Sequence, residues 1–383
     1  MNQEQKVILT GIKPTGMPHL GNLCGAIKPM VEFINQKQDN ETIYCFIPDI
    51  HALNGGLEPA KIREYSYGLI ATYLACGMDP SKVIMFRQSA IRQHAELATL
   101  LTPITPKGMM NRAHSYKAAV DKNKYKFIKE DQNTANLIEF MEQNKEYAKE
   151  TNQPYEVQEM ISKQIDDMTN LRLDAGINMG LYTYPILMAA DILLYHTNTV
   201  PVGKDQIQHI EMTRDLANSF NTRYSPTFTM PDYESKDDAP EISGLDGRKM
   251  SKSYGNHIPI FCNEMELKGY IKKIITDSAK PEEPKDVENS TLVQLYELFA
   301  DEAKTADYKE RLAKGGFGYG DAKQELFDVI NNDLAPKREI YNELMANRKK
   351  LEEILRENEE QARRVAEKTM RKVRKKMGLV DVI

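Results

Sequence analysis

The chain has 383 residues, of which 41% are hydrophobic and 28% are charged. This composition excludes a fibrous or disordered protein, and the length predicts two domains with enough residues for a substantial core. No run approaches the roughly 20 apolar residues that cross a bilayer, and the first residues lack the basic and apolar regions of a signal peptide. We therefore expect a cytoplasmic protein without a membrane partner.

The cysteines and the charges exclude some further classes of site. The four cysteines are scattered without metal-ligand spacing, so neither a zinc site nor a disulfide framework is indicated, and we expect no bound structural metal. The net charge is -5, yet residues 338–383 contain 13 Lys/Arg against 9 Asp/Glu. Basic residues thus concentrate near one end, so the negative net charge does not exclude a nucleic-acid partner.

Short apolar runs alternate with helical patterns in the first part of the chain. Apolar runs at 7–9, 43–47 and 83–86 predict strands, and residues 22–33 and 60–76 have helical patterns. Strands that alternate with helices indicate an α/β fold with a mostly parallel sheet.

The composition changes twice along the chain. Residues 121–172 are rich in Lys, Glu, Gln and Asn, with apolar residues at helical spacing, which predicts a charged helical hairpin inserted into the α/β domain. This hairpin is either an RNA or subunit contact or an exposed decoration. After about residue 261, strand signals fade and charged helical patterns dominate, so we expect a second, all-helical domain.

The turn after the first predicted strand has the features of a nucleotide site. Gly11 and Gly21 permit close backbone approach, and a helix that begins near Gly21 would present unpaired N–H groups to phosphate. His19 and Asn22 can donate hydrogen bonds there. The alternative is an ordinary Gly/Pro-rich turn.

A second segment, GRKMSKS at residues 247–253, carries two lysines three positions apart in a Gly/Ser-rich loop. Lys249 and Lys252 could move onto a triphosphate and stabilise the charge that develops on departing pyrophosphate. The alternative is a solvated basic loop, which is disfavoured because this string accompanies the first segment.

Together these segments resemble the signatures of class I aminoacyl-tRNA synthetases: residues 19–22 (HLGN) are similar to HIGH, and residues 249–253 are an exact KMSKS. Within that class, residues 182–195 and 200–215 resemble the tryptophanyl-tRNA synthetases. The resemblance implies a Rossmann-like parallel-sheet catalytic domain at 1–260 and a helical anticodon-binding domain at 261–383. It also implies ATP with Mg²⁺, L-tryptophan and a tryptophan-specific tRNA as ligands, and a homodimer.

The resemblance also assigns roles to individual residues. It makes Asp191 the acceptor for the indole N–H, with Tyr184 and Gln206 at the ammonium and carboxylate of tryptophan and with Met188 and His51 in the same pocket. Catalytic roles fall to His19, Asn22, Lys249 and Lys252. The expected ATP-binding residues are Lys13, Pro14, Thr15, Gly21, Asn22, Gly203, Lys204, Asp205, Ile242, Lys249, Met250, Ser251, Lys252 and Ser253.

A basic cluster near the end of the chain is the expected tRNA contact. Eight Lys/Arg, including Arg374 and Lys376, accompany one acid, Glu367, between residues 363 and 376. On a helix these residues form a positive surface suited to phosphate, or simply a solvated helix face. The residues expected to bind tRNA are Arg363, Arg364, Lys368, Arg371, Lys372 and Lys375.

Three other functions remain open at this point. A tyrosyl-tRNA synthetase is the nearest, although its first motif usually differs from residues 18–20. A nucleotidyltransferase with a similar HIGH turn would usually lack the helical domain, and a catalytically silent paralogue would be expected to lack the signature lysines.

Overall fold

The computed structural model describes residues 5–130, 139, 143–144, 174–235 and 241–380. Within these residues, five parallel strands form one sheet in the order β3-β2-β1-β4-β5. The strands are β1 (Lys6–Gly11), β2 (Glu41–Ile47), β3 (Ile84–Arg87), β4 (Thr199–Val202) and β5 (Asp232–Ser235). The predicted parallel α/β sheet is therefore confirmed.

Both faces of the sheet are buried, which explains why its strands are apolar runs. Successive side chains of a strand point to opposite faces. In β1, Ile8 packs into one hydrophobic cluster and Leu9 into the other. In β2, Ile43 and Tyr44 divide between the clusters in the same way.

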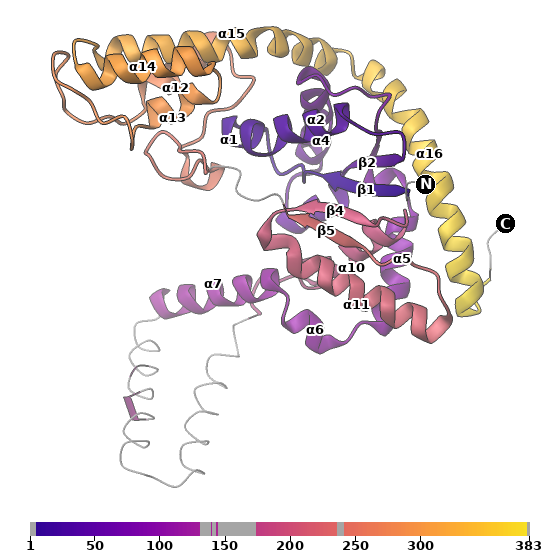
Figure 1. The fold of residues 1–383 in the computed structure, drawn as a ribbon. Helices are drawn as coiled ribbons and strands as arrows, with labels where there is room; N and C mark the ends of the chain where they lie inside the picture. Colours follow the sequence, from indigo (N-terminus) through magenta and orange to yellow (C-terminus); the bar gives the residue numbers. More distant parts are fainter. Residues whose placement is uncertain (1–4, 131–138, 140–142, 145–173, 236–240, 381–383) are drawn as a thin grey trace.

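Helices cover the two faces of the sheet (Figure 1). One face packs against α2 (Lys28–Asn35) and α4 (Pro59–Ala75), and the other against α5 (Gln93–Leu101), α10 (Met179–Leu193) and α11 (Ile207–Tyr224). Short helices occupy the connections: α1 (Leu20–Asn22), α3 (Asp49–Ala52) and α6 (Lys107–Asn111). The expected helix at 22–33 begins at Leu20 instead and passes through a π-helical turn at Leu23–Ile27 before α2.

The inserted hairpin expected at 121–172 lies largely outside the described residues. Helix α7 (His114–Glu130) leads into this segment and begins before residue 121. The prediction for the hairpin therefore stays a prediction.

The rest of the described chain is helical, as expected. It contains α12 (Glu264–Lys272), α13 (Thr291–Glu297), α14 (Glu302–Lys314), α15 (Tyr319–Ala346) and α16 (Arg348–Met377). The first four gather at one end of the molecule, whereas α16 turns back and runs along the edge of the α/β part (Figure 1).

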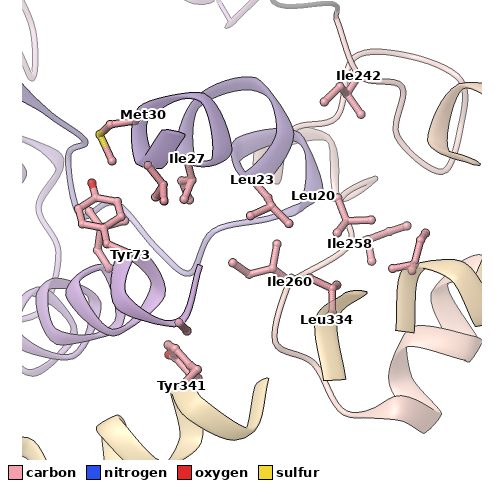
Figure 2. Packing of buried hydrophobic residues seen from close by; sticks show 14 of the residues in the cluster. Leu20, Leu23, Ile27, Met30, Tyr73, Ile242, Ile258, Ile260, Leu334 and Tyr341 are labelled. Carbon is pink, nitrogen blue, oxygen red and sulfur yellow. The ribbon is translucent and has the colours of Figure 1, made fainter. Parts of the chain in front are cut away.

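The helical part shares its hydrophobic core with the α/β part. Figure 2 shows Leu20 and Leu23, which follow β1, packed near Ile258, Ile260 and Leu334. All five residues belong to one buried cluster and are at most 1% exposed. The hydrophobic core is therefore continuous across the domain boundary that the sequence predicts between residues 260 and 261.

Helix α16 packs on the sheet side of the molecule. Ala362, Ala366, Met370 and Val373 are fully buried in the cluster that also contains β1, α5 and α10 residues. Helix α16 therefore belongs by its contacts to the α/β part as well as to the helical part, although it lies within the expected domain 261–383.

Ion pairs reinforce this packing at two places along α16. Arg87, at the end of β3, donates to both oxygens of Glu352 and of Glu359. Farther along, Arg374 lies 2.6 Å from Glu96 of α5 and 2.8 Å from Glu367. Arg374 is buried, so it is a structural residue rather than part of the exposed basic surface to which the sequence assigned it.

In the portion of the chain described, no helix is long and apolar enough to span a membrane. Of the four cysteines, Cys45 is buried, whereas Cys24, Cys76 and Cys262 are partly buried. Burial raises the pKa of the Cys45 thiol to about 12, which makes it a poor nucleophile at neutral pH.

We predict that Met370→Ala lowers the free energy of unfolding by about 2–5 kcal/mol, because it removes fully buried atoms between α16 and the sheet. Chemical denaturation measures this change. Glu353→Ala, at an exposed position of the same helix, is the control and should change stability by less than about 0.5 kcal/mol. Equal effects of the two substitutions would show that α16 is not packed as described.

Candidate active site

The HLGN motif is joined by backbone hydrogen bonds to the segment that follows the KMSKS motif. Leu20 N–H donates to the carbonyl of Ile258 at 2.9 Å, and Ile260 N–H donates to the carbonyl of Pro18 at 3.2 Å. The segment that follows KMSKS therefore runs antiparallel beside the HLGN segment, with His19 opposite Pro259. This pairing fixes the distance between the two motifs.

Lys252 reaches across to the turn that precedes the first motif. Gly16 has a φ of 146°, and a Cβ built there would lie 2.9 Å from Lys252 Nζ. The absence of a side chain at Gly16 therefore makes room for the lysine. Partial burial lowers the pKa of the Lys252 ammonium.

The N-terminus of α1 differs from the sequence expectation. His19 caps the helix: its Nδ1 accepts from the N–H of Asn22, whose side-chain oxygen accepts from the N–H of His19. Gly21 N–H donates to Met250 Sδ at 3.3 Å, and Leu20 N–H is bound to Ile258. The prediction that this helix presents unpaired N–H groups to phosphate is wrong, because these N–H groups already donate hydrogen bonds to the His19 cap, to Met250 and to Ile258.

Asn256, a residue that the sequence analysis did not single out, organises the KMSKS loop. Its side-chain oxygen accepts from the N–H of Ser251, and its amide donates to the Lys249 carbonyl and to Asp246. Gly244 permits this contact, because a Cβ there would lie 2.5 Å from the Asn256 side chain. Hydrogen bonds from Asn256 and Arg248 lower the pKa of Asp246 to about 2.

Ile242 and Met250 form the base of the same loop. Both are buried, and Met250 N–H donates to the Ile242 carbonyl at 2.8 Å. Lys249 is exposed and lies 3.9 Å from Glu241, whereas Ser251 accepts from Ser253 N–H and starts a short helical turn. The expected ATP-binding residues of this loop are thus held together by local bonds; both lysine side chains are exposed overall, and the ammonium of Lys252 lies against Gly16.

The other expected ATP-binding residues lie where the sheet reverses its strand order. The chain proceeds from β1 to β2 and β3 on one side, and β4 lies on the other side of β1. Such a switch point is the usual ligand crevice of open parallel sheets. Lys13 to Thr15 follow β1 and Gly203 to Lys204 follow β4, with Lys13, Thr15, Gly203 and Lys204 exposed. Pro14 is buried, and the side chain of Asp205 lies outside the described residues.

Asp191 lies near the end of α10 and is 1% exposed. Its Oδ2 lies 2.9 Å from His51 Nε2, and its Oδ1 lies 2.6 Å from His94 Nδ1 and 2.7 Å from Gln88 Nε2. Burial by itself would raise the pKa of Asp191, but the hydrogen bonds from His51 and His94 outweigh it and lower the pKa. The carboxylate is therefore ionised and held among donors at neutral pH.

Tyr184 and Gln206 meet through His209. The Tyr184 hydroxyl lies 2.9 Å from His209 Nδ1, and the Gln206 side-chain oxygen lies 3.1 Å from the same nitrogen. His51 packs edge-on against the Tyr184 ring, which connects this group to Asp191. Met188 lies on α10 one turn before Asp191 and is partly buried. Four of the residues expected to bind tryptophan thus form one connected group through His209, and Met188 shares helix α10 with two of them.

Sequence reasoning missed Gln88, His94, His209 and Asn256. A signal was available for Gln88, because it directly follows β3 and so lies at the same sheet edge as His51, which follows β2. His94 and His209 lie on helices, and the sequence around them contains no signal that they belong to a site. Asn256 follows the KMSKS string by three residues, but its bonds depend on the closure of the loop.

The expected tRNA residues occupy the C-terminal half of α16. Arg364, Lys368, Arg371, Lys372 and Lys375 are exposed. Arg363 is half-buried and donates to the Ala90 carbonyl, and Lys376 donates to Pro226 and Thr227. The exposed Lys and Arg side chains therefore belong to the half of α16 that packs beside the α/β part, away from α12 to α15 (Figure 1).

Comparisons with known proteins agree with this geometry. The family described as tRNA synthetases class I (W and Y) matches residues 1–141 and 142–335. A tryptophan–tRNA ligase of Neisseria meningitidis is 40% identical over 375 residues, which cover 98% of either chain. A tryptophan–tRNA ligase of Pseudomonas putida is also 40% identical, over 97% of this chain and 73% of the relative.

Solved structures give the same result. The tryptophanyl-tRNA synthetase of Campylobacter jejuni, complexed with ADP and tryptophan, superposes with a TM-score of 0.79 at 35% identity, covering 97% of this chain and 100% of that one. A tyrosyl-tRNA synthetase of Archaeoglobus fulgidus reaches a TM-score of 0.55 at 17% identity over 89% and 91% of the two chains, which shows the shared fold alone. With its paired motifs and near full-length similarity, this chain belongs to the class I tRNA synthetases of the tryptophan and tyrosine group.

Proposed function

We propose that the chain is a tryptophan–tRNA ligase, which activates L-tryptophan with ATP and transfers it to the 2′-OH at the 3′ end of its tRNA. The observation that carries this proposal is that the HLGN segment is hydrogen-bonded to Met250 and to the segment that follows KMSKS, at the carboxyl end of the sheet, where Asp191 contacts His51 after β2 and Gln88 after β3. The similarity to tryptophan–tRNA ligases over nearly the whole chain supports the same substrate. The silent-paralogue and nucleotidyltransferase alternatives fit less well, because both signature lysines and the helical part are present.

In the first step, the tryptophan carboxylate attacks the α-phosphorus of ATP and pyrophosphate leaves. This reaction requires no protein nucleophile, so the protein contributes position and charge stabilisation. Lys252 is already beside the turn at Gly16, and Lys249 lies on the exposed side of the same loop. We assign to these two lysines the stabilisation of the departing pyrophosphate, with Lys13 as a further cation for phosphate.

Mg²⁺ would neutralise charge on the phosphate oxygens of ATP. Among the described residues, no group of three His, Cys, Asp or Glu side chains could hold a metal ion. Mg²⁺ commonly binds through substrate phosphates and water rather than through a protein cage. An ion that arrives with ATP would need no protein cage, and Lys249 and Lys252 would be available for the other phosphate oxygens.

His19 is suited to act as a neutral donor. Burial, helped by the nearby Lys252 and His257, lowers the pKa of His19 to about 4. Since Nδ1 accepts from Asn22 N–H, the proton of the neutral ring must be on Nε2. We assign this Nε2–H to a phosphate oxygen, while Asn22 keeps the ring in place.

Tryptophan would lie between the Asp191 group and the motifs. Indole has one N–H donor and a large apolar face, so a buried carboxylate beside Met188 provides suitable chemistry. Tyr184 and Gln206, joined by His209, would hold the ammonium and carboxylate end. A tyrosine substrate would place its hydroxyl at a different depth in the pocket from the indole N–H of tryptophan.

The exposed lysine and arginine side chains of α16 are the proposed tRNA contact. Arg364, Lys368, Arg371, Lys372 and Lys375 form a positive face beside the α/β part, where phosphates would bind. We further propose a cytoplasmic homodimer, on the resemblance to the family. The helical part at 261–383, which includes α16, is the proposed anticodon-binding domain.

The function predicts that purified protein exchanges labelled pyrophosphate into ATP when tryptophan is present. Tyrosine should support this exchange at a rate lower by about 10⁴-fold or more, because a misplaced hydroxyl leaves buried polar groups unpaired. Exchange that depends on tyrosine instead would assign the chain to the other branch of its family.

Lys252→Ala should lower the rate of tryptophan activation by about 10²–10³-fold, because it removes a charge that acts on the leaving group. The dissociation constant of tryptophan should change by less than about threefold, since Lys252 does not reach the amino-acid pocket. Pre-steady-state activation and equilibrium titration measure the two quantities. Lys272→Ala, at an exposed position of α12, should affect neither; equal losses in rate and affinity for Lys252→Ala would contradict the assigned role.

The His19 ring should titrate with a midpoint near pH 4 in an NMR titration. The folded pKa lies below the value of 6.5 in an unfolded chain, so the unfolded state binds protons first and this contribution to stability is lost as pH falls from about 6.5 to about 4. Lys252→Ala should raise the midpoint by removing a nearby positive charge. A midpoint near 6.5 in the unmodified protein would exclude the buried environment described for His19.

A further inference from the structure

The Asp191 carboxylate is held asymmetrically. Oδ1 lies within hydrogen-bond distance of two donors, His94 Nδ1 and Gln88 Nε2, whereas Oδ2 is bonded to His51 alone in the part of the chain that the structure describes. An ionised carboxylate oxygen accepts about two hydrogen bonds. Oδ1 is therefore saturated, and one acceptor site remains on Oδ2.

The donor orientation of Gln88 is fixed by the backbone. Its Oε1 accepts from the N–H groups of Ile50 and His51 at 3.1 and 3.3 Å. The amide nitrogen must then point to Asp191, which it contacts at 2.7 Å. Gln88 is fully buried, so no solvent competes for these bonds.

The donor orientation of His94 is fixed by the ionised Asp191 carboxylate, which can only accept a hydrogen bond and therefore requires the proton on Nδ1. His94 is fully buried; its Nδ1 faces Asp191 and its Nε2 lies 2.9 Å from the Tyr195 hydroxyl. With the proton on Nδ1, the ring donates to the carboxylate and accepts from the tyrosine. The chain Tyr195–His94–Asp191 is thus satisfied at every described bond.

We infer that Gln88 and His94 are positioning residues for tryptophan recognition, which tie Oδ1 of Asp191 and leave a single acceptor on Oδ2 for the indole N–H. This inference rests on the proposed function. Neither residue touches the substrate; each acts through Asp191. The geometry makes the pocket selective for a ring that offers one N–H at that point.

The test compares tryptophan with benzothienyl-alanine, in which sulfur replaces the indole N–H, in ATP–pyrophosphate exchange. The unmodified protein should prefer tryptophan in kcat/KM by roughly 10- to 100-fold, because the analogue leaves a buried acceptor unpaired. His94→Phe keeps an aromatic ring but removes the hydrogen bond to Asp191 Oδ1. This variant should bring the preference for tryptophan to within about threefold of unity. His94→Asn retains a donor near the position of Nδ1 and should keep a preference of about tenfold or more.

Gln88→Met is the second variant and should reduce the preference for tryptophan as His94→Phe does. The inference can therefore be tested if either variant folds. Thr72→Val, which removes a buried hydroxyl in α4, should leave the preference unchanged. Equal loss of activity toward both substrates, with an unchanged ratio, would reduce Gln88 and His94 to packing residues and overturn the inference. Failure of the unmodified protein to activate tryptophan would refute the proposed function instead.

Discussion

The antiparallel backbone pairing between residues 18–20 and 258–260 is the interaction on which the site depends. Two backbone hydrogen bonds hold the HLGN segment against the chain that follows KMSKS. The pairing is stable because Leu20, Ile258 and Ile260 are buried beneath it (Figure 2). Without it, Lys252 would have no fixed position relative to the turn at Gly16.

This pairing also explains why the first helix is not an open phosphate site. Its leading N–H groups are already bonded, so charge for the phosphates must come from side chains. The two lysines of the KMSKS loop are the proposed source of that charge. The helix cap instead determines which nitrogen of His19 carries the proton.

Helix α16 gives the molecule its second constraint. It leaves the helical part at Arg348 and packs its apolar face on the cluster around the sheet, with Arg87 and Arg374 as ion-pair anchors. A contact made by tRNA on its exposed bases would therefore act on the α/β part directly. The shared cores connect both parts of the chain.

The sequence by itself determined the parallel α/β sheet, the helical remainder and the family, because burial on both faces requires apolar runs and because HLGN and KMSKS are contiguous strings. It also indicated Asp191, through the resemblance. Only the tertiary structure decided that Arg374 is buried, that the N–H groups of α1 are occupied, and that Gln88 and His94 hold Asp191. Each of these depends on contacts between residues some 90 to 280 positions apart, and no local pattern encodes which distant group will satisfy a donor.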